Sequence, residues 1–315
     1  MRQGRHIVDV DIAVRNKENG AMRPHFLLRA LAAVLCAALL AGCSMLRIGY
    51  PQLDTIAGWT ADEYFDLDAQ QRQEFRKRFA RFHEWHRYDQ LPDYADFLTQ
   101  TKARLGKGFT REDVLWITKG VQQRYRAIVT YAADDAAAML MTITPEQLEN
   151  LRQQWDKANR SFIREYRLES GVAEQRRATG RRALSRIRDW VGHLDDAQEK
   201  QILAWGAELP LMNAPRHQDR MRRQREFLQL MAQRDDPTRF ASRLRHYLLN
   251  WEEGRDPAYD RMFDEWMERQ ADLYVKVYHL LLPHQRAAVA DRVQGYINDL
   301  TRLARRPAAQ AAAGR

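Results

Sequence analysis

The sequence predicts an all-α fold, a multi-helix bundle of roughly nine or ten helices. Glycine and proline are scarce, at 15 and 10 of 315 residues, and no run of alternating β-branched residues indicates a strand. Apolar side chains recur instead every three or four positions, as at Phe75, Phe79, Phe82 and His86. This spacing places them on one face of a helix, which buries such a stripe against other helices.

Residues 1–42 are predicted to be a signal peptide. Arg23 and Arg29 precede an apolar run from Ala30 to Ala41, which ends in small residues before a cysteine. This layout is typical of secretory signals. The run is shorter than the roughly 20 residues that span a membrane. Because the first 21 residues are polar and mixed in charge, we expect translation to start at Met22.

The four residues from Leu40 to Cys43 resemble the lipobox of bacterial lipoproteins. The resemblance implies cleavage between Gly42 and Cys43, after which Cys43 carries a diacylglycerol and an acylated amine, with palmitate as a typical chain. Ser44 stands where an aspartate would retain such a protein at the inner membrane. The resemblance therefore implies an outer-membrane lipoprotein facing the periplasm. The alternative is a free cysteine near the end of a signal peptide.

From Cys43 the chain has 273 residues and a net charge of +6, from 45 basic and 39 acidic side chains. The second cysteine, Cys36, lies inside the signal peptide, so none remains to form a disulfide. Outside the cytosol a mildly basic surface meets lipid head groups, cell-wall polymers and acidic protein segments, and we expect no nucleic-acid partner. Residues 43–55 are expected to be a lipidated tether, and residues 305–315 a disordered tail.

N-cap residues, prolines and glycines predict where the helices begin and end. Asp236 and Asp256 each stand before a proline, which is the order of an N-cap followed by the first helical position. Breaks are expected at five further places: Leu91–Pro92, Gly106–Gly108, Gly171, Pro210–Pro215 and Gly254.

One five-residue pattern recurs four times, as LDAQQ, ITPEQ, LDDAQ and LLPHQ. Each copy reads as an apolar residue, a cap, two variable residues and a glutamine. This is the order of a capping box, in which the cap accepts an N–H of the first turn and the glutamine accepts the cap's own N–H. The fourth copy has Leu282 at the cap position, so its box is incomplete. The predicted capping residues are Asp68, Gln71, Thr144, Gln147, Asp195, Gln198 and Gln285.

The four copies can be grouped into two pairs. Leu67 and Ile143 begin copies that lie 76 residues apart, and Leu194 and Leu281 begin copies 87 residues apart. In each pair the first copy has an LD start and the second carries a proline. This suggests two related helical halves, residues 56–192 and 193–304, that arose by duplication. The alternative is four independent helix starts that obey the same capping chemistry, and both stay open.

The repeated pattern resembles the LTxxQ motif of periplasmic chaperones of the Spy and CpxP kind, which bind unfolded chains without ATP. ITPEQ is the nearest match. More broadly, the lipobox, GYPQLDTIAGW, YFDLDAQQ and the final LLPHQ resemble a family of uncharacterised Gram-negative lipoproteins, known only as a domain of unknown function. That resemblance implies location and helical content, and no activity.

No residue pattern indicates catalysis, a metal site or a cofactor. His83 and His86 are three residues apart, whereas a zinc-protease helix needs a spacing of four with a glutamate between, and no third ligand is apparent. No phosphate loop or serine nucleophile motif occurs. We therefore expect a protein that is not an enzyme.

Two arginine-rich segments, around residues 176–188 and 216–225, are the candidate partner-binding sites. Arginine stacks on aromatic rings and binds carboxylates and phosphates with two donors. The alternative is a solvated helix face paired with acids from neighbouring helices. The residues singled out for binding an anion or a protein partner are Arg177, Arg181, Arg182, Arg186, Arg222 and Arg223.

Two functions follow as hypotheses. The first is a non-catalytic, chaperone-like or envelope-stress binding domain, which takes unfolded or acidic protein partners and is held at the membrane by its lipid. It predicts an apolar groove with a basic rim. The alternative is a structural or accessory lipoprotein that docks on an envelope complex or a cell-wall polymer, and it predicts a flatter surface.

Overall fold

The computed structural model of the chain describes residues 44–306, so the predicted signal peptide (residues 1–42), Cys43 and residues 307–315 of the expected tail lie outside the described residues. Of the described residues, 84% are helical and none forms a strand, which confirms the all-α prediction. The helices follow in the order α2 (Ser44–Gly49), η1 (Tyr50–Gln52), α3 (Leu53–Phe65), α4 (Ala69–Trp85), η2 (His86–Gln90), α5 (Leu91–Leu105), α6 (Arg111–Leu140), α7 (Pro145–Glu165), α8 (Val172–Val191), α9 (Asp196–Ala207), α10 (Asn213–Ala232), α11 (Pro237–Leu249), α12 (Pro257–Leu280) and α13 (Pro283–Leu303).

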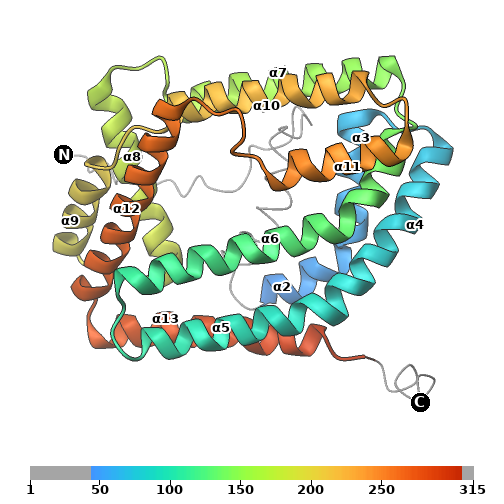
Figure 1. The fold of residues 1–315 in the computed structure, drawn as a ribbon. Coiled ribbons are helices and arrows are strands. Elements are labelled where there is room, and N and C mark those ends of the chain that lie inside the picture. The colour runs from blue at the N-terminus through green and yellow to red at the C-terminus, as the bar shows by residue number, and fades with distance from the viewer. Residues whose placement is uncertain (1–43, 307–315) are drawn as a thin grey trace, which may run out of the picture.

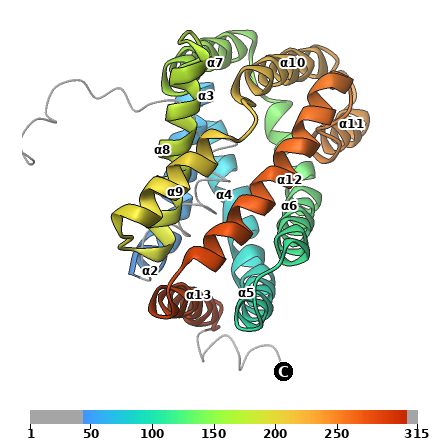
Figure 2. The same cartoon turned by 90° about the vertical axis from the view of Figure 1, so that its left-hand side faces the viewer.

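The structure is the predicted multi-helix bundle, and its long helices are arranged as the sides of a frame (Figure 1). In this view α5 and α13 lie along one edge and α7 and α10 along the opposite edge, while α8, α9 and α12 form one side and α3 and α4 the other. Helix α6 crosses between the sides, and Figure 2 shows α12 running beside α9 when the frame is turned. No helix among residues 44–306 is long and apolar enough to cross a membrane.

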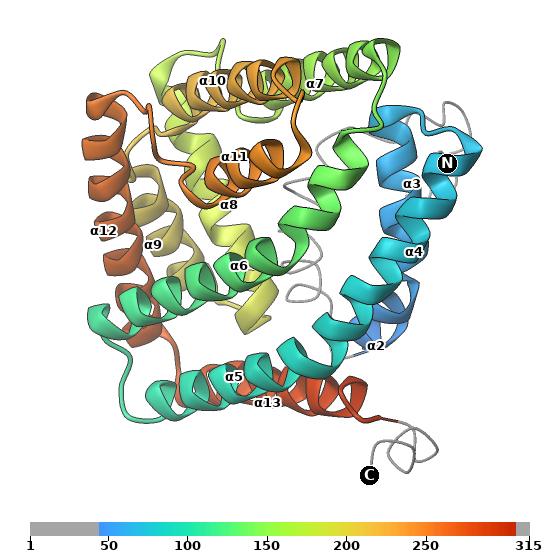
Figure 3. The same cartoon turned by 45° about the vertical axis from the view of Figure 1, so that its right-hand side comes forward.

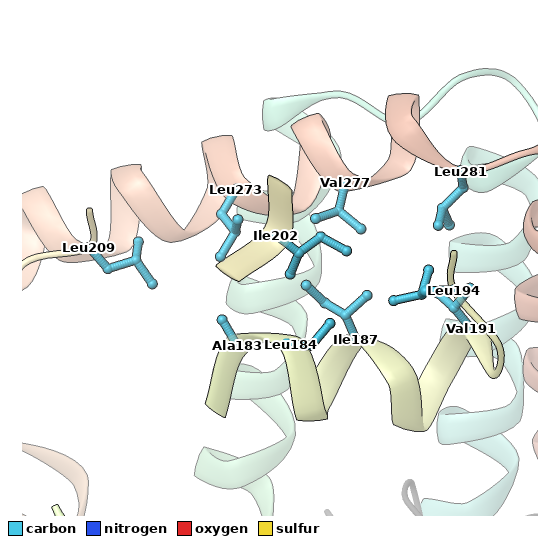
Figure 4. Close-up of a cluster of buried hydrophobic side chains, with 10 residues drawn as sticks. All are labelled: Ala183, Leu184, Ile187, Val191, Leu194, Ile202, Leu209, Leu273, Val277 and Leu281. Atoms are coloured by element: carbon cyan, nitrogen blue, oxygen red, sulfur yellow. The ribbon is translucent and has the colours of Figure 1, made fainter. Parts of the chain in front are cut away.

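Three clusters of buried side chains hold the frame together. The first joins α8, α9 and α12, where Ile187, Ile202 and Val277 point toward one another (Figure 4). The second joins α2 and α5 to α13, and the third joins α3 and α6 to α10 and α11. Each cluster takes residues from both sides of the boundary expected near residue 192. The two halves therefore share their cores, and their common origin stays a prediction.

Helices α8 and α9 approach each other through glycine. A Cβ atom on Gly180 would lie 2.6 Å from the carbonyl oxygen of Leu203, and one on Gly206 would lie 2.7 Å from the Cβ of Ala183. These distances are well below van der Waals contact, so the close approach requires residues without a side chain.

The N-terminal segment differs from the expected tether. Residues 44–52 form α2 and η1, and both Leu46 and Tyr50 are buried in the cluster that contains Tyr296 and Leu300 of α13. The sequence shows no long apolar stripe here, because only two side chains in this short segment enter the core. The described segment is thus fixed to the domain and is not a flexible linker.

The expected break at Leu91–Pro92 is a bend instead. Helices α4 and α5 continue into each other through η2, a π-helical segment in which the N–H of Leu91 bonds the carbonyl of His86. Proline has no N–H to donate, and the wider π turn before Pro92 absorbs this irregularity. The chain therefore changes direction at η2 without leaving the helix, as Figure 3 shows.

Candidate functional site

The predicted capping residues lie at helix starts. The side chains of Asp68, Thr144 and Asp195 accept the N–H of the glutamine three residues later, at 2.8, 3.3 and 2.8 Å. Leu282 has no acceptor, yet the Oε1 of Gln285 still accepts the Leu282 N–H at 2.8 Å. All four helix starts therefore use the glutamine in the same way.

The glutamines also contact one another. Gln71 Nε2 donates to Gln147 Oε1 at 3.0 Å, and Gln147 Nε2 donates back to Gln71 Oε1 at 2.6 Å. The second hydrogen of each amide bonds a backbone carbonyl just before the partner's pattern, that of Thr142 for Gln71 and that of Asp66 for Gln147. Every donor and acceptor of this buried pair is used.

Gln198 and Gln285 repeat this arrangement. Their amides exchange hydrogen bonds of 2.8 and 2.9 Å, and they donate to the carbonyls of Leu280 and His193, which again precede the partner's pattern. The two glutamine pairs belong to the copies of the pattern that were grouped together from the sequence, 76 and 87 residues apart in the chain. Because their polar atoms are all occupied and buried, these glutamines join helices and offer no free group to a ligand.

Most of the arginines singled out on α8 are engaged within the domain. Arg177 and Arg181 both bind Glu174, at 2.9 and 2.7 Å. Arg182 donates to the carbonyl of Glu165 at 2.5 Å and stacks on Tyr166. Arg186 is exposed, and no ion pair is found for it among the described residues.

The arginines singled out on α10 bind α11 and the loop before α12. Arg222 pairs with Asp219 and Glu226 and donates to the carbonyls of Trp251 and Glu253. Arg223 donates to the carbonyl of Tyr247 at 3.1 Å and stacks on its ring at 4.1 Å. These two side chains hold the fold together and do not form a free basic face.

Sequence reasoning missed Arg255, the most deeply buried arginine of this region. Its side chain is 2% exposed and lies 4.2 Å from the Trp251 ring centroid, with Asp219 at 3.6 Å and Asp260 at 3.3 Å. The glycine before it has a positive φ, and Asp256 after it is the N-cap of α12. These local signals mark a loop and do not indicate a buried arginine.

An aromatic row runs along α4 and onto α6, and its members are Phe75, Phe79, Phe82, Trp85 and Tyr131. Neighbouring rings lie 5.6 to 5.8 Å apart along α4. Trp85 stacks on Tyr131 at 3.9 Å with the planes 4° apart. The row follows the predicted apolar face of α4.

The aromatic row is only partly covered. None of its four members on α4 is fully buried, Tyr131 is 41% exposed, and the only buried side chain of α4 is that of Gln71. Phe75 packs against the cluster of α3, α6, α10 and α11, and Phe82 contacts Tyr131 of α6. An apolar face this long and half-open is the feature in the described residues that best fits a binding surface.

Basic side chains flank the aromatic row. Arg78 and Arg81 bind Asp135 of α6 at 2.6 and 2.9 Å on one edge. Arg76 and Lys77 are exposed on α4 and form no ion pair among the described residues. Because successive residues of a helix are about 100° apart, Arg76 lies at the edge of the row and Lys77 on the opposite face of α4. The row therefore has one unpaired cation, that of Arg76, at its edge.

The far end of the aromatic row is closed by His86. Its Nδ1 lies 2.9 Å from the hydroxyl of Tyr50, and its Nε2 lies 3.3 Å from that of Tyr94. Burial lowers the pKa of His86 to about 4 and raises the pKa of both tyrosines. A neutral ring held at both nitrogens positions the helices and has no free site for proton transfer. No group of acids, histidines or cysteines within residues 44–306 is arranged to hold a metal ion.

A family model described as a family of unknown function (DUF6279) matches residues 63–260. The chain belongs to this family. The DUF6279 region contains the whole aromatic row, the pair Gln71–Gln147 and Arg255, while α2 and α13 lie outside it. No curated protein and no solved structure matches the chain.

Proposed function

We propose that the protein is an outer-membrane lipoprotein, anchored through Cys43 and facing the periplasm, whose helical domain binds apolar segments of non-native polypeptides without catalysis. The half-covered aromatic row of α4 and α6 is the observation that carries this proposal. Aromatic side chains contribute much of the energy of protein contacts, and a row of them accepts many apolar sequences.

The charge beside the row selects among such segments. Arg76 is exposed and lies at the edge of the row between Phe75 and Phe79, so an apolar segment flanked by aspartate or glutamate gains a favourable electrostatic interaction. The similarity of ITPEQ to the LTxxQ motif supports the same class of activity, although the glutamines themselves join helices. The anchor rests on the Leu40–Cys43 pattern in the sequence.

The test of binding uses the full lipidated protein in detergent or nanodiscs, with light scattering as the readout. We expect it to suppress aggregation of an unrelated unfolding protein without ATP, and Phe79→Ala with Phe82→Ala to reduce suppression. The matched control is Phe109→Ala, which removes a half-buried ring outside the row. Circular dichroism and thermal melts verify that each variant folds.

Suppression that is equal in the row variant and the control contradicts the proposal, and so does no suppression at several-fold excess. The second of these results, together with one stoichiometric partner recovered from envelope extracts, favours the accessory-lipoprotein alternative. The anchor is tested separately by Cys43→Ser, which should abolish palmitate labelling and leave an uncleaved precursor.

A further inference from the structure

The described end of the domain nearest Cys43 gathers arginine side chains. They come from α2, from η2 and from the end of α13 and its extension, and this arginine end consists of Arg47, Arg87, Arg302, Arg305 and Arg306. Leu46 of α2 and Leu303 of α13 are buried in one cluster, which places the two segments side by side. In Figure 3 α2 and the end of α13 lie at the same corner of the frame.

Local contacts bring these arginines together. Arg47 and Arg302 both act electrostatically on Asp299. Arg87 donates to the carbonyl of Leu303 at 2.7 Å, and the guanidinium groups of Arg87 and Arg306 lie 5.5 and 5.1 Å from the ring of Tyr88. These contacts place four of the arginines at a single end of the domain, and Arg305 directly precedes Arg306 there.

The arginines of the arginine end form no ion pair within the described residues, in contrast to the paired arginines of α8 and α10. The nearby carboxyl of Asp299 is 6% exposed, and burial raises its pKa. Ile48, the most exposed large apolar side chain described, lies at this same end at 66% exposure.

We infer that the arginine end lies on an anionic phospholipid surface, with Ile48 entering the interface. This rests on the proposed acylation of Cys43, which directly precedes Ser44, the first residue of α2. Because Leu46 and Tyr50 fix α2 to the domain, the acyl chains hold this end, and no other, within reach of head groups. Arginine binds phosphate oxygens with two donors, and basic clusters next to an anchor add to membrane affinity.

The orientation has a consequence for binding. Tyr50 and His86 connect this end to the far end of the aromatic row, so the row begins near the membrane and extends away from it along α4 toward Phe75. The membrane contact would therefore fix the direction in which the aromatic row faces. The acyl anchor on Cys43 would orient the domain as well as hold it at the membrane.

The test uses the full lipidated protein in vesicles of phosphatidylcholine with or without phosphatidylglycerol. Mature chains have no free thiol once Cys43 is acylated, so Ile48→Cys gives a single site for a spin label. Val172→Cys is the matched control, because Val172 is 60% exposed but lies on α8. The relaxation of the spin label by oxygen, which partitions into lipid, is compared with its relaxation by a water-soluble nickel chelate. The ratio reports whether the label lies in lipid or in water.

We expect the label at residue 48 to shift toward oxygen accessibility in the anionic vesicles, while the label at residue 172 remains water-accessible in both. Arg302→Glu with Arg305→Glu should abolish the shift, whereas Arg177→Glu with Arg181→Glu, the same charge change on α8, should not. The shift of the label at residue 48 is first measured in the protein that keeps all its arginines. That measurement does not depend on how the glutamate variants fold.

A label at residue 48 that is as water-accessible as that at residue 172 overturns the inference when mass spectrometry shows acylated Cys43. Equal shifts in anionic and neutral vesicles overturn the role of the arginines. Absence of acylation refutes the anchor, and the inference with it, while the aggregation assay still decides the binding function separately.

Discussion

The side-chain amides of Gln71 and Gln147 donate to each other, with Nε2–Oε1 distances of 3.0 and 2.6 Å. Each glutamine also completes a capping box at the start of its own helix. One amide therefore stabilises a helix end and the contact between α4 and α7. Gln198 and Gln285 have the same relationship between α9 and α13.

Gln71→Ala should destabilise the domain by about 1–3 kcal/mol, because it leaves the buried amide of Gln147 without its partner. Gln147→Ala should cost a similar amount. The double variant should cost less than the sum, with a coupling of about 0.5–3 kcal/mol. Urea unfolding measures all three. Gln73→Ala, which removes an exposed glutamine of the same helix, is the control, and additive effects would contradict a direct pair.

Gly180→Ala should destabilise the domain by about 1–3 kcal/mol, since the new Cβ meets the carbonyl of Leu203 at 2.6 Å and backbone cannot move aside easily. Gly58→Ala is the opposite case. Gly58 lies inside α3 with nothing within 4 Å of the added Cβ, so better helix propensity should stabilise by about 0.5–1 kcal/mol. Thermal melts of the two variants should therefore shift in opposite directions.

Stability should fall as the pH falls from about 6.5 to about 4. Burial lowers the pKa of His86 to about 4, so between these values the unfolded chain binds a proton that the folded chain does not. The loss should be complete below pH 4 and amount to at most about 3 kcal/mol. The pKa of His83 is lowered by burial as well and acts in the same direction.

His86→Gln should flatten this pH dependence of the free energy of unfolding, measured by urea titration at several pH values. His284→Gln, at an exposed position on α13, leaves the His86 cluster intact and is the control. An unchanged slope in His86→Gln would show that other groups cause the acid sensitivity.

Arg255→Ala should destabilise by about 3 kcal/mol, because it removes a buried cation from between Asp219 and Asp260 and leaves a void among three aromatic rings. Arg177→Ala should cause no measurable loss, since Arg177 is largely exposed to solvent and Glu174 keeps its ion pair with Arg181. Equal stability of the two variants, by urea unfolding, would contradict this account of the buried guanidinium.

The fold class could be predicted because helical periodicity is a local property of the sequence. The capping residues were equally visible, since Asp68 and Thr144 act within one turn of their own helices. The hydrogen bonds between the glutamine amides could not be predicted, because they depend on how α4 and α7 pack together. The spacing of the repeated pattern in the chain suggested that two copies form a pair, but it could not specify the geometry of their contact.

The candidate site also depends on contacts between segments that are distant in sequence, which local patterns do not predict. The stripe on α4 was apparent, but a stripe alone predicts burial, whereas none of its aromatic residues on α4 is fully buried in the fold. The arginines of α8 and α10 looked free because their partners include carbonyls and rings that are distant in sequence, such as Tyr247 for Arg223. Composition reveals charge, and only the fold reveals which charges are already paired.

The cluster that joins Leu46 and Tyr50 to Leu300 and Leu303 connects the two ends of the described chain. Contacts across some 250 residues carry a large loop-closure entropy and slow the search for the native state. Helix α13 also supplies Gln285, so neither this cluster nor the second amide pair can form until the last helix is available. The domain therefore remains incomplete until almost all of the described chain is available to fold.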